Sequence, residues 1–185
     1  GEKKMRIAKW ILAAAVAVTA MGGKEQPKVQ LCMTSSVQNS SYIEWSKKIA
    51  TEIFNEAGVS LEWASRKACR PDAIRIRIQD NTAPETHPHA YAYAMPYEGH
   101  TIVVLYDRVE KENKGAALPY VLAHVLAHEI GHILEGVARH SDSGTLKAAF
   151  TPVDRAAMVN HHIGFAPEDV HLIHAGIADR AKTGI

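Results

Sequence analysis

Cysteine is scarce in this sequence and the charge is almost balanced. The 185 residues contain two cysteines, too few for a structural zinc site made of four thiolates. The formal net charge is +1 at pH 7; residues 1–20 carry +3 of it, which leaves −2 on the rest of the chain. A slightly acidic domain gives no reason to propose nucleic acid as a partner, and we expect none.

Features that define several other enzyme classes are also missing. The sequence has no glycine-rich phosphate loop, no serine nucleophile elbow, no internal repeat and no long low-complexity tract. With 46% hydrophobic and 22% charged residues, the composition is that of an ordinary globular protein. The length suffices for one domain with its own hydrophobic core, and we expect a monomer.

The first twenty residues are typical of a signal peptide. Lys3, Lys4 and Arg6 precede an apolar run at 10–20, which ends in the small-residue triplet Val-Thr-Ala. This run is too short to span a bilayer as a helix. We therefore predict a signal peptide at 1–20 and a secreted or periplasmic domain at 21–185, without stable membrane insertion. The alternative is a buried N-terminal helix.

Cys32 and Cys69 are candidates for a disulfide bond. In an oxidising compartment the two thiols can pair, which would join the first expected strand to the loop after the second. The alternative is two unrelated thiols. Neither lies near the histidine motif in sequence, so we do not expect them to bind metal.

The most informative stretch is His128-Glu129-Ile130-Gly131-His132. Two histidines four residues apart lie on one face of a helix, where their neutral ring nitrogens can bind one Zn²⁺ ion. Glu129 lies beside that ion, where it can act as general base on a metal-activated water. His140 is the expected third ligand. The alternative is a carboxylate from a later segment, drawn from Glu135, Asp142, Asp154 and Glu168.

The surroundings of the motif favour a buried helix. Residues 118–134 are apolar with no proline after Pro119, and Gly136 is placed to end the helix. His124 lies one turn before His128, but three ligands on one straight helix fit a tetrahedral site poorly. We therefore expect His124 to be packed or to support a ligand rather than to bind metal.

The other elements follow from hydrophobic periodicity and turn residues. We expect strands at 29–34, 59–63, 73–78 and 101–106, and a short edge strand at 90–94. A helix should begin at a capping box, Ser41-x-x-Glu44, with Tyr42 and Trp45 in the core, and should end at Gly58. Further helices are expected at 151–162 and from residue 166 onward.

This order of elements resembles the N-terminal half of zincin-type zinc metallopeptidases, and of metzincins in particular. The resemblance implies an α+β, zincin-like fold: a small twisted mixed sheet packs on the H-E-x-x-H helix, an edge strand borders a substrate cleft, and the C-terminal part is helical. Metzincins place the third histidine six residues after the second, whereas His140 follows His132 by eight. Leu146 stands where metzincins have a methionine beneath the metal, and its similar volume can fill that apolar floor.

The sequence from His128 to Leu146 is also similar to a group of secreted bacterial proteins with the pattern H-E-x-G-H-x-L-x-G-x-x-x-H-S-x-x-G-x-M, except that Leu146 replaces the final methionine. We therefore predict a zinc-dependent metalloendopeptidase that acts on a peptide or protein substrate, with His128, His132 and His140 as ligands and Glu129 as base. The alternatives are a zinc hydrolase of non-peptide amides and a catalytically inactive zincin-like binding module. An edge strand at 90–94 left unpaired on one side would favour the peptidase.

Overall fold

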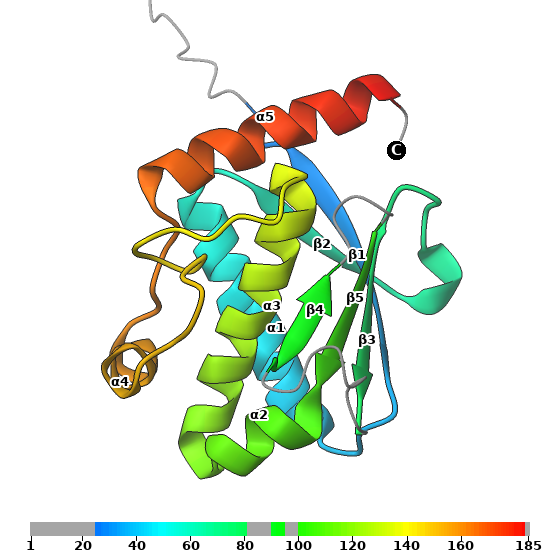
Figure 1. Ribbon diagram of the computed structural model, residues 1–185. Coiled ribbons are helices and arrows are strands. Elements are labelled where there is room, and N and C mark those ends of the chain that lie inside the picture. Colours follow the sequence, from blue (N-terminus) through cyan, green and yellow to red (C-terminus); the bar gives the residue numbers. More distant parts are fainter. Residues whose placement is uncertain (1–24, 81–89, 95–99, 184–185) are drawn as a thin grey trace, which may run out of the picture.

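A mixed five-stranded sheet forms one layer of the protein (Figure 1). The structure, a computed structural model, describes residues 25–80, 90–94 and 100–183. The strand order is β2-β1-β3-β5-β4, in which β4 runs antiparallel to β5 and the other pairs are parallel. The strands are β1 (Lys28–Ser35), β2 (Ser60–Ala64), β3 (Ile74–Gln79), β4 (Ala92–Ala94) and β5 (Thr101–Leu105).

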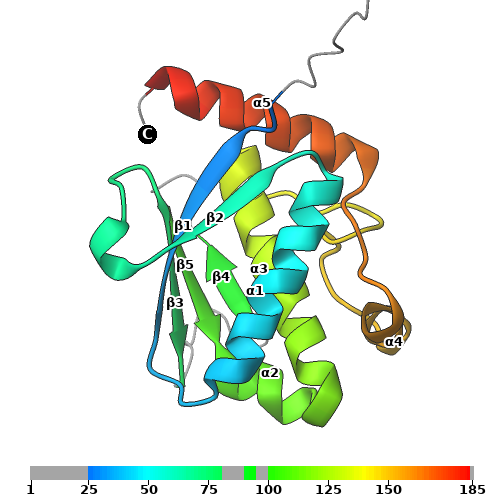
Figure 2. The same ribbon diagram turned by 180° about the vertical axis from the view of Figure 1, so that it is seen from behind.

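Two helices, α1 (Ser40–Glu56) and α3 (Leu118–Glu135), cover one face of the sheet (Figure 2). The apolar residues of β3 are buried in the core with both helices, whereas Arg75 and Arg77, which alternate with them, are exposed. None of the described α-helices covers the face that carries these arginines (Figure 1). The alternation along β3 thus decides which face of the sheet is buried.

Helix α3 is buried along almost its whole length. The segment Gly115–Glu135 is long and apolar enough to cross a membrane, but 83% of its apolar 18-residue window is buried inside the protein. Its apolar character is therefore that of a central core helix. Gly136 ends the helix at a left-handed φ of 71°, which glycine adopts without steric cost, so the predicted stop is confirmed.

The expected strands and helices are present with ends shifted by one or two residues, but three details were wrong. The strand predicted at 101–106 ends at Leu105, because Tyr106 begins the short helix α2 (Tyr106–Glu112). No side-chain hydrogen bond caps α1, and Glu44 pairs with Lys47 instead of closing a capping box. Trp45, expected in the core, is 55% exposed.

The C-terminal part is helical, as expected. Helix α4 (Pro152–Asn160) begins with a capping box between Thr151 and Asp154, and α5 (Pro167–Thr183) packs against the end of α3. Cys32 and Cys69 form a disulfide bond between β1 and the residue after the short 3₁₀ turn Arg66–Ala68. The structure thus decides for the pairing, which the sequence had left open. The expected signal peptide lies outside the described residues.

Candidate metal centre

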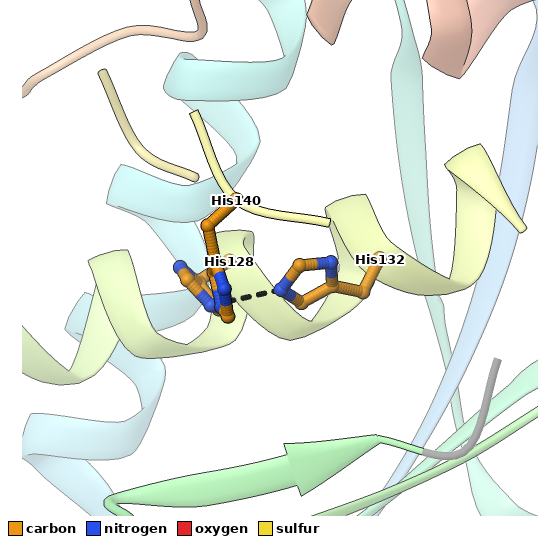
Figure 3. A group of neighbouring side chains, drawn as sticks. All are labelled: His128, His132 and His140. Carbon is orange, nitrogen blue, oxygen red and sulfur yellow. Dashed lines mark hydrogen bonds between the residues drawn. The ribbon is translucent and has the colours of Figure 1, made fainter. Parts of the chain in front are cut away.

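Three histidine rings converge at the C-terminal part of α3 (Figure 3). His128 and His132 project from one face of the helix, with their Nε2 atoms 3.0 Å apart. His140 reaches back from the loop after Gly136, and its ring centre lies 5.4 Å from that of His128 and 5.0 Å from that of His132. One ring nitrogen from each residue lies within 4.8 Å of the others.

This geometry fits a tetrahedral zinc site. Ligands about 2.0–2.1 Å from Zn²⁺ in a tetrahedron are separated by about 3.3 Å, close to the 3.0 Å between the two Nε2 atoms. The Nδ1 atom of His128 donates a hydrogen bond to the Thr145 carbonyl at 2.9 Å. The other ring nitrogen, Nε2, therefore carries the lone pair that can bind an ion. The residues expected to bind metal are thus brought together, and the loop two residues longer than in metzincins does not prevent it.

Burial prepares these side chains to bind a cation. It lowers the pKa of His128 to about 4 and that of His132 to about 3, so both rings are neutral at pH 7. Burial also raises the pKa of Glu129 to about 8. A nearby divalent cation favours the ionised carboxylate, so an ion at the three histidines would lower the pKa of Glu129 again.

A buried carboxylate holds the loop that carries His140. Asp169, in the first turn of α5, is fully buried. Its Oδ1 accepts hydrogen bonds from Arg139 and Ser141, each at 2.5 Å, and its Oδ2 accepts one from the Ala166 backbone N–H at 3.2 Å. The two side chains that flank His140 are therefore tied to one group. Sequence reasoning missed this role, because Arg139 and Asp169 are 30 residues apart and no local pattern joins them.

Leu146 forms part of the apolar floor under the site. It is fully buried, and its Cδ2 lies 3.0 Å from the position that a Cβ on Gly131 would occupy. Phe165 approaches the same position to 3.1 Å. Gly131 therefore gives room to two side chains.

Two other candidate ligands, His124 and Asp154, are engaged elsewhere. His124 is fully buried; its Nδ1 donates to the Tyr120 carbonyl and its Nε2 accepts from the Ile163 N–H, both at 2.8 Å. It is packed, as predicted. Asp154, the preferred alternative third ligand, caps α4 and pairs with Lys147 at 2.7 Å. Among the described residues, only the three histidines gather as a metal-binding group.

The site opens into a cavity of about 520 Å³ beside the edge strand. His128, Glu129 and His140 line it. Residues 147–150 also line it, as do Tyr91 and Ala92 beside and in the edge strand. Within the described sheet β4 pairs only with β5, so its other side is unpaired, as expected for the strand predicted at 90–94.

No protein-family model and no curated protein matches this chain. Its fold is the zincin-like fold of the metzincin type. The solved structure of archaemetzincin from Methanopyrus kandleri is similar, with a TM-score of 0.61 at 12% sequence identity, and the match covers 82% of this chain and 96% of that chain. The expected α+β architecture is therefore confirmed, whereas the expected likeness to secreted bacterial proteins finds no support in these comparisons.

Proposed function

We propose that this protein is a zinc-dependent metallopeptidase that cleaves peptide or protein substrates. The observation that carries the proposal is the cluster of His128, His132 and His140 beside a buried Glu129, with His128, Glu129 and His140 lining a cavity. The similarity of the fold to archaemetzincin supports it. The disulfide supports our further proposal that the protein works in an oxidising compartment, outside the cytoplasm.

Each residue of the site has a defined task in this proposal. The three histidines would hold zinc, which when bound would polarise a substrate carbonyl and make a water molecule more acidic. Glu129 takes a proton from the attacking water at a carboxylate oxygen and passes it to the nitrogen of the leaving amine. Thr145 fixes the ring of His128 through its carbonyl, which keeps Nε2 aimed at the ion.

The free side of β4 supports a peptide as the substrate. The Leu105 N–H donates to the Tyr91 carbonyl at 2.8 Å, so the backbone of Tyr91 faces β5. Because successive residues of a strand point their backbone groups to opposite sides, the N–H and C=O of Ala92 point away from β5. Ala92 also lines the cavity. An extended peptide can therefore add to the sheet beside the histidines.

Metal content and peptide cleavage, measured on the same preparations, test the proposal. We expect one zinc ion per chain in the wild type and in Glu129→Gln, with cleavage of a peptide library reduced at least about 10²-fold in the variant only. His140→Ala should lose zinc, whereas His161→Ala, an exposed histidine outside the cluster, should keep both zinc and activity.

Two outcomes would favour the alternatives. Zinc bound with no cleavage of any peptide by the wild type would overturn the peptidase proposal and favour a binding module. Hydrolysis of non-peptide amides alone would identify a different zinc hydrolase. Loss of cleavage in His161→Ala equal to that in Glu129→Gln would mean that the assay does not report on this site.

A further inference from the structure

Two cationic side chains line the cavity beyond the three histidines, and they differ in what neutralises them. Lys147 forms an ion pair with Asp154, with its Nζ 2.7 Å from a carboxylate oxygen. That carboxylate also accepts hydrogen bonds from the side chain and the backbone N–H of Thr151 at the start of α4. The charge of Lys147 is therefore already balanced within the protein.

Arg155 has no such partner among the residues that the structure describes. It lies one residue after Asp154 on α4, is half-buried, and lines the same cavity as His128, Glu129 and His140. One guanidinium nitrogen donates to the Phe150 carbonyl at 2.8 Å, which fixes the position of the side chain. Among the described residues, no carboxylate lies within ion-pair distance of Arg155.

The one exposed acid on the cavity wall is engaged elsewhere. Glu112 accepts a hydrogen bond from the Tyr91 hydroxyl on the edge-strand side. The cavity thus offers a fixed guanidinium with free N–H donors, and a guanidinium pairs best with a planar carboxylate through two parallel hydrogen bonds. A basic substrate side chain would instead meet a like charge, that of Arg155.

We propose that Arg155 selects substrates that place a carboxylate in this cavity. The proposal rests on the proposed peptidase function and adds the class of substrate. The carboxylate has two possible sources, the side chain of an Asp or Glu near the scissile bond and the C-terminal carboxylate of a short peptide. Both present the same group to the guanidinium, so the experiment must separate them.

Binding to the zinc-loaded Glu129→Gln protein tests this selection without depending on turnover. The probes are hexapeptides of alanine blocked at both ends, with one Glu or one Gln at each position in turn, and the all-alanine peptide with a free or an amidated C-terminus. We expect at least one Glu peptide, or the free C-terminus, to bind at least tenfold more tightly than its neutral partner. Arg155→Gln in the same protein should abolish that preference. Arg155→Lys, which keeps the charge but not the two parallel N–H donors of the guanidinium, should retain part of it.

Arg77→Gln is the matched control, because it removes an exposed arginine from the opposite face of the sheet and should leave the preference unchanged. Equal binding of carboxylate and neutral peptides would overturn the proposal, as would a preference that survives Arg155→Gln in folded, zinc-loaded protein. A preference lost equally in Arg77→Gln would also overturn it. If the wild type cleaves peptides without this preference, the peptidase proposal is supported and the proposed role of Arg155 is wrong. If binding shows the preference but no peptide is cleaved, the role of Arg155 is supported and the peptidase proposal is wrong.

Discussion

Replacing Asp169 with asparagine should weaken zinc binding without touching a ligand. Asp169 is fully buried and accepts hydrogen bonds from Arg139 and Ser141, the two neighbours of His140. Asparagine keeps the shape but removes the charge opposite Arg139. Because supporting groups of this kind typically contribute 10- to 100-fold to metal affinity, we expect the dissociation constant for zinc to rise by about that factor.

The same change should destabilise the metal-free fold. Hydrogen bonds to charged groups contribute about 1.5–3 kcal/mol each, and an unpaired buried charge costs about 3–5 kcal/mol. Arg139 keeps a partial partner in Glu135, whose carboxylate lies 3.6 Å from its Nε. We therefore expect a loss of about 2–3 kcal/mol in the free energy of unfolding, near the lower end of these ranges.

Competition with a chromophoric chelator measures the zinc affinity, and urea unfolding of the metal-free protein measures stability. Asp179→Asn is the control, since it removes an exposed carboxylate from the same helix and should change neither quantity appreciably. If Asp169 acts through His140, the Asp169→Asn change should add nothing to the zinc affinity already lost in His140→Ala. Equal zinc affinity of the two asparagine variants, or fully additive losses with His140→Ala, would refute this reasoning.

Three further predictions concern stability. Replacing Cys32 and Cys69 by serine should lower the free energy of unfolding by about 3–4 kcal/mol, because the 37-residue loop regains freedom in the unfolded chain; reduction of the wild type should match it in urea titrations. Burial lowers the pKa of His124 to about 4 from 6.5, so the unfolded chain binds a proton there more tightly than the folded protein does. The free energy of unfolding should therefore be highest above pH 6.5 and should fall by about 3 kcal/mol as the pH decreases to about 4. Unfolding midpoints of the metal-free protein should decline over that range, and less so in His124→Gln. Leu146→Ala should cost about 2–5 kcal/mol and Leu146→Met less than about 1.5; equal thermal shifts would contradict the proposed apolar floor.

The sequence predicted the site well where its chemistry depends on local spacing. Helical geometry alone brings His128 and His132 to one face, with Nε2 atoms 3.0 Å apart, and Gly136 ends the helix where a left-handed residue is needed. The alternation in β3 likewise predicted its buried face. Local rules failed where contacts from elsewhere decide, as at Trp45, which has helical spacing with the core residues of α1 but lies exposed.

By itself, the sequence determined the identity of the reactive groups: two imidazoles one helical turn apart, a carboxylate between them, and a further imidazole beyond a glycine. Only the tertiary structure decided that this last imidazole returns to the other two, because its loop is held by Asp169 from a helix 30 residues away. It also decided that Asp154 neutralises Lys147, whereas no carboxylate of the described residues pairs with Arg155, which lines the same cavity. Spacing along one helix is a property of the chain, whereas burial and pairing between distant segments exist only after the chain has folded.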